Sequence, residues 1–243
     1  MAPIDLTHIE DHFVNGGGQF IRSAFDIQQR LRQIQALVFD WDGVFNDGGK
    51  GFHSQSNFTE VDTLGIHLLR YGLYRATGQL PAIAIISGQE NPSALYLAQR
   101  DHYTAVYSRS RDKAKALRHF CDQQGITPGQ TAYFYDDLLD LSVAQEVGLR
   151  FAVGRLANPL LLDYVEQHRL ADYISACQGQ EHAVREFCEL LLGILGLYDM
   201  VLESRLQADE KHQEYTRLRD AVKTTFYRDQ AGQLSAYQPE ILS

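Results

Sequence analysis

The chain has 243 residues, with 22 Lys and Arg against 31 Asp and Glu, a formal net charge of −9 and 44% apolar residues. This apolar content is sufficient for a hydrophobic core and excludes wholesale disorder. The excess of acid argues against nucleic acid and against an anionic membrane as partners, because both bind basic surfaces.

Cysteine content and the first residues of the chain favour a cytoplasmic protein. The three cysteines are an odd number at no metal-like spacing, which argues against a disulfide framework and against a Cys-ligated zinc. Residues 1–13 lack the basic and apolar regions of a signal peptide. No stretch approaches the ~18 apolar residues of a membrane span. We therefore expect a cytoplasmic localisation.

The first half of the chain starts irregularly and then becomes patterned. Residues 1–19 are weakly patterned, include three consecutive glycines and are expected to form an N-terminal extension. An apolar stripe then predicts a helix over residues 20–34. Short continuous apolar runs follow, and these are typical of strands buried on both faces. The strands are expected at residues 36–39, 82–86, 104–107, 131–135, 151–153 and 173–174.

Helical patterns separate these strands. They cover residues 64–75, 91–99, 112–121 and 138–147. Strands that alternate with helices predict an α/β fold with a parallel sheet flanked by helices. Residues 48–62 interrupt the alternation, because they are polar and rich in glycine, and we expect a small flap hairpin there.

The last third of the chain has a helical pattern. An apolar stripe runs from Val184 to Leu195, and a charged stretch follows from Glu203 to Arg219. We expect a central domain over residues 20–196 and a helical C-terminal extension over residues 197–243. The charged stretch has the composition of a solvated helix face. A sharper hypothesis places three of its side chains against another subunit: Leu206, Tyr215 and Leu218.

Acidic residues follow two of the predicted strands. Asp40 and Asp42 come after the first strand, and Asp136, Asp137 and Asp140 come after the fourth. In an open parallel sheet the carboxyl ends of the strands line one crevice, so both groups are expected to face it. Carboxylates packed together repel one another, and a divalent cation removes that repulsion. Oxygen ligands of this kind suit Mg²⁺, which pairs with substrate phosphates.

Other strand ends offer groups that would bind a phosphate. Ser87 and Gly88 supply a hydroxyl and backbone N–H groups at a helix start, and Lys113 supplies an ammonium at another. Asp40 would then attack phosphorus, while Asp42 protonates the leaving oxygen and activates water. The predicted chemistry is phosphoryl transfer, in which charge stabilisation does most of the work.

These residues resemble a known family. The segments Phe39–Val44 and Asp136–Asp140, together with Ser87 and Lys113, are similar to the four motifs of the haloacid dehalogenase superfamily of phosphatases. The run from Phe39 to Gly48 resembles the FDxDGVxTDG signature of the KDO 8-phosphate phosphatase group. The resemblance extends over roughly residues 34–195, with the motifs in the same order.

The resemblance implies a capless, Rossmann-like domain that depends on Mg²⁺ and hydrolyses a small phosphorylated sugar acid. It also implies a homotetramer in which a neighbouring subunit helps to close the site, and a flap that matches the predicted hairpin. By the same resemblance, Asp40 and Asp136 bind the metal by their side chains and Asp42 by its backbone carbonyl. Asp137 and Asp140 support the site from behind.

Three positions depart from the family pattern: Asn46 replaces Thr, Gln89 replaces a frequent Arg, and Tyr135 replaces Gly. We expect these positions to lie where the substrate tail is recognised. Two alternatives therefore stay open. One is a phosphatase for another small metabolite, such as a nucleotide or a simple sugar phosphate. The other is a non-catalytic oligomerisation module, against which the complete set of motif residues speaks.

The same residue types also have ordinary structural roles. An Asp-x-Asp-Gly sequence at a strand end is also found in ordinary turns, and Ser87 on its own is typical of a helix cap. His53 and His182 are candidates for lining a substrate pocket. Asp47 and Asp62 are candidates for the same site or for turns and caps.

Overall fold

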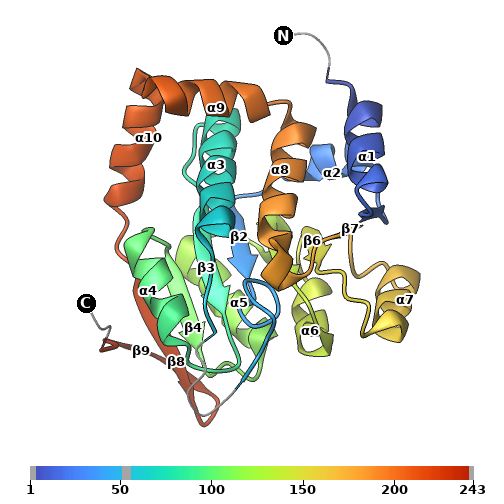
Figure 1. Cartoon of the computed structure of the whole chain (residues 1–243). Helices are drawn as coiled ribbons and strands as arrows, with labels where there is room; N and C mark the ends of the chain where they lie inside the picture. Colours follow the sequence, from blue (N-terminus) through green and yellow to red (C-terminus); the bar gives the residue numbers. More distant parts are fainter. Residues whose placement is uncertain (1–3, 51–55, 241–243) are drawn as a thin grey trace.

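The computed structural model describes residues 4–50 and 56–240. These residues are built around one nine-stranded sheet with the order β1-β7-β6-β5-β2-β3-β4-β8-β9 (Figure 1). The strands are β1 (Gln19–Phe20), β2 (Ala36–Phe39), β3 (Ala82–Ile86), β4 (Ala105–Ser108), β5 (Thr131–Tyr135), β6 (Leu149–Ala152), β7 (Tyr173–Ile174), β8 (Thr225–Gln230) and β9 (Gln233–Tyr237).

The seven strands from β7 to β8 are parallel, and only the two outermost strands run against their neighbours. β2 is central, and Phe39 at its end pairs with Ile85 of β3 and Phe134 of β5. This register brings the carboxyl ends of β2, β3 and β5 to one edge of the sheet. The predicted α/β fold with a parallel, Rossmann-like sheet is confirmed.

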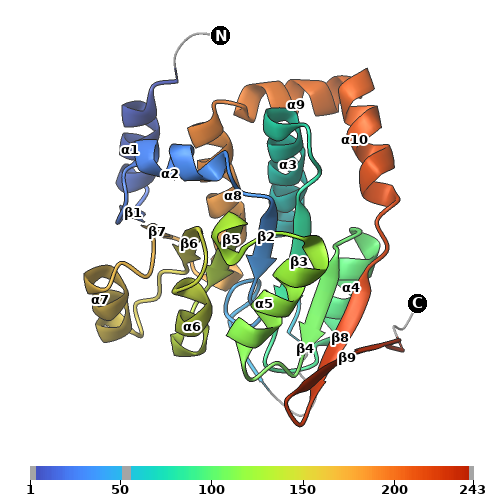
Figure 2. The ribbon, with the colours of Figure 1, turned by 180° about the vertical axis from the view of Figure 1, so that it is seen from behind.

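Helices cover both faces of the sheet (Figures 1 and 2). One face is covered by α2 (Ala24–Leu31), α3 (Glu60–Thr77), α4 (Pro92–Arg100) and α8 (Ala183–Leu195). The other is covered by α5 (Lys113–Gln124), α6 (Leu141–Ala144) and α7 (Pro159–Gln167). Outside the first layer lie α1 (Leu6–Asn15), α9 (Tyr198–Gln207) and α10 (Glu210–Asp220). Short 3₁₀ helices are η1 (Pro128–Gln130), η2 (Leu138–Asp140) and η3 (Gly179–Glu181).

Alternate side chains of β2 enter two separate cores. Leu37 and Phe39 pack on the α3–α8 side, whereas Ala36 and Val38 pack on the α5 side. A strand sends successive side chains to opposite faces, and both faces here are covered by helices. This double burial explains why the central strands appear in the sequence as continuous apolar runs.

Aromatic rings fasten α8 to the sheet. Phe39 stacks on Phe134 with 4.5 Å between the ring centroids, and Phe134 stacks on Phe151 at 5.1 Å. Phe187 of α8 lies 5.6 Å from Phe134 and 5.7 Å from Phe151. Aromatic side chains bury large areas and add directional contacts, so this row is a main anchor of the core between α8 and the sheet.

The N-terminal segment is more ordered than its sequence pattern indicates. Residues Leu6–Asn15 form α1, whose first turn is capped by the Asp5 side chain, and Gln19–Phe20 pair with β7. The helix predicted over residues 20–34 is shorter and spans Ala24–Leu31. α7 was not expected, and the helix predicted over residues 138–147 divides into η2 and α6. These local differences leave the order of strands unchanged.

The C-terminal extension is helical only as far as Asp220. The prediction of a helical extension is wrong for residues 225–237, which form β8 and β9 and join the sheet beside β4. β8 begins with Thr, Phe and Tyr, which favour strands, and Ala231 and Gly232 turn the chain with positive φ values of 53° and 84°. Most of both strands is incompletely buried, so no apolar run marks them.

The predicted flap hairpin falls largely on residues 51–55, which lie outside the described part of the chain. Residues 48–50 and 56–59 on either side of them contain no strand. Helix α3 then begins at Glu60, four residues earlier than expected. The division of the sequence into residues 1–19, 20–196 and 197–243 stays a prediction.

Asp62 is a helix-capping residue. Its buried carboxylate accepts hydrogen bonds from the Thr59 hydroxyl at 2.7 Å and from the backbone N–H of Arg185 at 3.1 Å. It therefore joins the start of α3 to the start of α8. His182 also contacts Asp62, with 3.4 Å between Nδ1 and Oδ2, and His53 lies outside the described residues. Burial raises the pKa of Asp62.

Among the described residues, no helix is both long enough and apolar enough to cross a membrane.

Truncating the ring that anchors α8 tests this account of the core. Phe187→Ala is expected to lower the free energy of unfolding by about 3–5 kcal/mol, because a fully buried ring is replaced by a cavity. Chemical denaturation measures the loss. Leu206→Ala is the control, because this α9 side chain is 86% exposed, and its effect should stay within about 0.5 kcal/mol. Equal effects of the two substitutions would contradict the anchoring role.

Candidate active site

Three strands and one helix deliver polar groups to a single cavity at the carboxyl edge of the sheet. Asp40 follows β2, Gly88 lies two residues after β3, Asp136 follows β5 and Lys113 opens α5. The cavity has a volume of about 590 Å³. It is lined by Asp40, Asp42, Asp47, Gly48, Lys50, Gly88, Gln89, Ser110, Arg111, Lys113, Asp136, Asp137, Leu139, Asp140 and Arg155.

Lys113 lies between two buried carboxylates. Its ammonium donates to Asp40 Oδ1 at 2.7 Å and to Asp140 Oδ1 at 2.5 Å. The hydroxyl of Tyr133 donates to the same Asp140 oxygen at 2.5 Å. Although burial lowers the pKa of Lys113, attraction to Asp40 and Asp140 raises it above the ordinary value. Lys113 is therefore a fixed positive charge beside Asp40.

Three buried carboxylates form a group suited to a cation. One oxygen each from Asp40, Asp136 and Asp140 lies within 4.8 Å of the others. Burial, followed by repulsion from Asp140, raises the pKa of Asp40 well above its ordinary range and that of Asp136 to about 7. Buried acids in this state are stabilised by a divalent cation with oxygen ligands, and Mg²⁺ fits the donor set.

Asp42 lies at the mouth of the cavity, and its carboxylate has three partners. Ser56 donates to Oδ1 at 2.7 Å, and Asn91 donates to Oδ2 at 3.3 Å. Lys50 approaches Oδ2 at 2.5 Å. The side chain is 22% exposed, more than that of Asp40. A carboxylate held at the mouth is placed to exchange a proton with a leaving group or with water.

The phosphate-binding segment predicted after β3 divides into exposed and buried parts. Gly88 and Gln89 line the cavity, whereas Ser87 is 2% exposed. The Ser87 hydroxyl accepts hydrogen bonds from the side chain of Asn91 at 3.0 Å and from the backbone N–H of Gln89 at 3.2 Å. Ser87 therefore shapes this segment, and Asn91 connects it to Asp42.

Asp137 and Asp47 lie at the rim of the cavity. The Asp137 side chain accepts from the backbone N–H of Leu138 at 2.6 Å, so it caps η2 as well as lining the cavity. Asp47 accepts from the backbone N–H of Gly49 at 2.8 Å. Both carboxylates stabilise turns that border the cavity.

Arg155 is a site residue that the sequence reading missed. Its guanidinium lies 2.9 Å from Asp136 Oδ2 and donates to the backbone carbonyl of Gly43 at 3.4 Å. Gly43 has a φ of +88°, and a Cβ there would lie 2.0 Å from Asp136 Oδ2, so glycine is required. Arg155 follows β6, and the rule that strand ends supply site residues would have found it.

The three departures from the family pattern have different surroundings. Gln89 lines the cavity, as expected. Asn46 ties the loop after β2 together, because its side chain accepts from the N–H of Gly48 at 2.9 Å and donates to the Asn57 carbonyl at 3.1 Å. Tyr135 was expected near the substrate tail, and this is wrong. Its side chain is buried on the α5 side, and its hydroxyl donates to the carbonyl of Leu170 at 2.9 Å.

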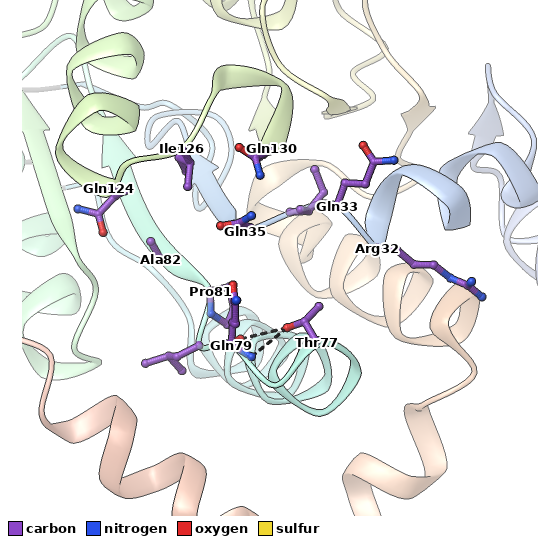
Figure 3. Close-up of a pocket in the computed structure, with 12 residues that line it drawn as sticks. Arg32, Gln33, Gln35, Thr77, Gln79, Pro81, Ala82, Gln124, Ile126 and Gln130 are labelled. Carbon is purple, nitrogen blue, oxygen red and sulfur yellow. Dashed lines mark hydrogen bonds between the residues drawn. The ribbon is translucent and has the colours of Figure 1, made fainter.

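A second cavity of about 600 Å³ lies at the opposite, amino edge of the sheet (Figure 3). Gln35, Ala82 and Gln130 border it at the starts of β2, β3 and β5. Five glutamines line this cavity, and among the described residues of its lining only Arg32 is ionisable. The described residues that line it include no carboxylate, histidine, lysine or cysteine, which favours the carboxyl edge as the place of acid–base chemistry.

Solved structures similar to this chain include a hydrolase of the HAD superfamily and a KDO 8-phosphate phosphatase. A HAD-superfamily hydrolase of subfamily III A from Legionella pneumophila has a TM-score of 0.62 and 27% identity, over 75% of this chain and 95% of that one. KDO 8-phosphate phosphatase from Moraxella catarrhalis, in complex with magnesium, phosphate and KDO, has a TM-score of 0.60 and 27% identity, over 73% and 97%. The fold and the site thus define a haloacid dehalogenase-type hydrolase.

Sequence comparison identifies the family within these haloacid dehalogenase-type hydrolases. The chain is 31% identical over 174 residues to 3-deoxy-D-manno-octulosonate 8-phosphate phosphatase of Escherichia coli strain B, over 72% of this chain and 87% of that protein. No model of a known protein family matches the chain. On the strength of the curated relative, the chain belongs to the KDO 8-phosphate phosphatase family. It is therefore an enzyme of the class that hydrolyses phosphoric monoesters.

Metal addition and removal test the carboxylate group. Mg²⁺ at 100 times its dissociation constant is expected to stabilise the protein by about 2.7 kcal/mol, because the cation binds only the folded state. Asp136→Asn should lose most of this gain, whereas Asp163→Asn on the exposed surface of α7 should keep it. Thermal melting with Mg²⁺ and with a chelator measures both effects. An undiminished gain in Asp136→Asn would contradict the site.

The stabilisation of the folded protein by Mg²⁺ should depend on pH. The folded-state pKa of Asp136 is about 7, above its ordinary value of 3.8, so the metal-free folded protein binds more protons and loses stability as pH rises towards 7. Mg²⁺ competes with those protons. Its stabilising effect should therefore be larger at pH 8 than at pH 6, and the reverse order would count against this assignment.

Proposed function

We propose that this chain is a Mg²⁺-dependent phosphatase that hydrolyses KDO 8-phosphate or a similar phosphorylated sugar acid through an aspartyl-phosphate. The observation that carries the proposal is the buried Asp40, which is paired with Lys113 and lies within one cavity with Asp42 and Asp136. Family membership supports the same chemistry, because the relatives are named as phosphatases and one solved relative holds magnesium, phosphate and KDO.

In the first step Asp40 attacks the phosphorus atom and the bond to the sugar oxygen breaks. Asp42 gives that oxygen a proton, so the sugar leaves as an alcohol. In the second step Asp42 takes a proton from water, and the resulting hydroxide attacks the aspartyl-phosphate. Inorganic phosphate leaves, and Asp40 is regenerated as a carboxylate. The location of Asp42 at the mouth of the cavity suits both proton transfers.

The metal would be held by the side chains of Asp40 and Asp136 and by the backbone carbonyl of Asp42. When bound, it supplies positive charge that offsets repulsion between the phosphate and the nucleophile. Asp137 and Asp140 support these ligands. Asp140 does so by fixing the Lys113 ammonium, and Asp137 by capping the turn that follows Asp136.

Phosphate binding is assigned to Ser87, Gly88 and Lys113. Gly88 presents backbone at the cavity wall, and Ser87 organises that backbone through its bond from the N–H of Gln89. The Lys113 ammonium lies 2.7 Å from the attacking carboxylate, so it can neutralise charge as phosphorus approaches. Preorganised donors of this kind cost no reorganisation during the reaction.

The proposal also includes the kind of substrate, the localisation and the oligomeric state. A cavity of about 590 Å³ suits a small metabolite, and four cationic side chains in its lining suit an anion. We place the enzyme in the cytoplasm as a homotetramer, without nucleic-acid or membrane partners. Of the side chains suggested for subunit contacts, Tyr215 is buried within the chain, which leaves Leu206 and Leu218 exposed for that role.

Asp40→Asn should abolish turnover, with a loss of about 10⁴-fold or more in kcat, because an amide cannot form the aspartyl-phosphate. Hydrolysis of a chromogenic phosphate ester with saturating Mg²⁺ measures it. Asp163→Asn is a matched control at an exposed position and should retain full activity. The variant's melting profile should show a folded protein. Wild-type turnover by folded Asp40→Asn would refute the mechanism.

A substrate panel tests the specificity. KDO 8-phosphate should give a higher kcat/KM than glucose 6-phosphate and adenosine monophosphate, because an acidic sugar offers a second charge to a cavity with several cations. Release of inorganic phosphate is the readout. A preference for the nucleotide would favour the alternative metabolite phosphatase. Failure to hydrolyse any phosphate ester would favour the non-catalytic assembly module.

A further inference from the structure

The C-terminal hairpin reaches the catalytic edge of the sheet. β8 runs parallel to β4 and pairs Ser108 with Arg228, and two further residues of β8 continue past the end of β4. Figure 1 shows the β8–β9 turn at the end of the molecule towards which the arrow of β2 points. The last residues of β8 therefore lie beside the loops that follow β3 and β4.

Arg228 connects this hairpin to the loop that follows β3. Its guanidinium lies 2.6 Å from Glu90 Oε1 and packs 4.1 Å from the centroid of the Tyr237 ring in β9. The Tyr237 hydroxyl is 3.5 Å from Glu90 Oε1 and 3.5 Å from the hydroxyl of Ser108. Stacking on a ring restricts the rotamers of an arginine, so the ion pair has a defined direction.

Glu90 also connects to the loop that follows β4. Its second oxygen, Oε2, lies 3.0 Å from Nε of Arg109. Arg109 adopts a positive φ of 58°, which non-glycine residues rarely adopt, and it precedes the turn that leads to Lys113. Glu90 thus lies between two arginines that belong to two different segments.

The segments that Glu90 connects carry the phosphate-binding groups. Glu90 directly follows Gly88 and Gln89, which line the cavity, and precedes Asn91, which donates to Ser87 and Asp42. Between Arg109 and Lys113, Ser110 lines the cavity, and its N–H donates to the Ser87 carbonyl at 3.0 Å. A displacement of Glu90 would therefore be transmitted to both segments.

We propose that the β8–β9 hairpin is a positioning element of the active site, in which Arg228 and Tyr237 hold Glu90 and thereby fix the phosphate-binding loop 87–91 and the turn 109–113. This inference rests on the proposed phosphatase function. Arg228 and Glu90 do not line the cavity, so they act through the loop backbone and not by touching substrate. The expected consequence is weaker phosphate binding with little change in the chemical step.

Arg228→Met and Glu90→Gln test the positioning role, since each removes one charge and keeps much of the side chain's bulk. Each should raise the inhibition constant of inorganic phosphate and the KM of a chromogenic phosphate ester about three- to five-fold, and leave kcat within about two-fold. The double variant should match Glu90→Gln, because that substitution already removes the ion pair with Arg228 together with the one with Arg109. Arg228→Lys should recover part of the loss.

Arg118→Met is the matched control. Arg118 forms an ion pair of the same kind with Glu146, 2.5 Å away between α5 and the segment after α6, and lies outside the cavity lining. It should leave both constants unchanged. Hydrogen–deuterium exchange provides a readout independent of catalysis, and backbone amides of residues 87–91 should exchange faster in Arg228→Met than in Arg118→Met.

These experiments distinguish failure of the positioning role from failure of the phosphatase function. If the unsubstituted protein hydrolyses phosphate esters and Arg228→Met leaves KM, phosphate inhibition and exchange unchanged, the positioning role is refuted while the phosphatase function stands. If the unsubstituted protein hydrolyses no phosphate ester, the phosphatase function fails, and with it the assignment of these loops to phosphate. Equal losses in Arg118→Met and Arg228→Met would also refute the positioning role.

Discussion

The ion pair between Lys113 and Asp40 is the interaction on which the rest of the site depends. A carboxylate buried at 5% exposure is costly unless charge and hydrogen bonds compensate it. Lys113 supplies this compensation and is itself held by Asp140, which Tyr133 also contacts. The parallel register of β2 and β5 brings these groups within reach, and α5 presents its first residue to them. The Asp40 carboxylate is thus kept buried, oriented and beside a fixed cation.

The charge of the whole chain and the charge of the cavity have different consequences. Among the described residues, six carboxylates and four cationic side chains line the cavity. If all were ionised, one divalent cation would balance their excess of two negative charges. Arg155 already compensates Asp136 on the side facing Gly43. The net charge of −9 therefore disfavours polyanions as partners, but it does not disfavour a small phosphate ester at a metal-loaded site.

Local patterns in the sequence were enough to predict the central strands and the acids that follow them. Phe39 and Phe134 lie in continuous apolar runs, and aspartates follow both runs directly. Arg155 could have been predicted from its place after β6, whereas the surroundings of Tyr135 depend on tertiary structure. Tyr135 lies next to the site in the sequence, but the alternation of a strand directs its side chain to the opposite core. β8 and β9 escaped prediction because they are half-exposed and their partner strand β4 is more than 100 residues away.

The C-terminal hairpin links the stability of the sheet to its function. Without β8, β4 would be an edge strand with unpaired backbone groups directly beside the cavity-lining loops after β3 and β4, and such edges are prone to mispairing. β8 satisfies those groups and continues past β4, so the residue that covers the end of the edge, Arg228, is also the one that contacts Glu90. The β8–β9 hairpin thus provides both an edge strand for the sheet and an ion pair to the loop that follows β3.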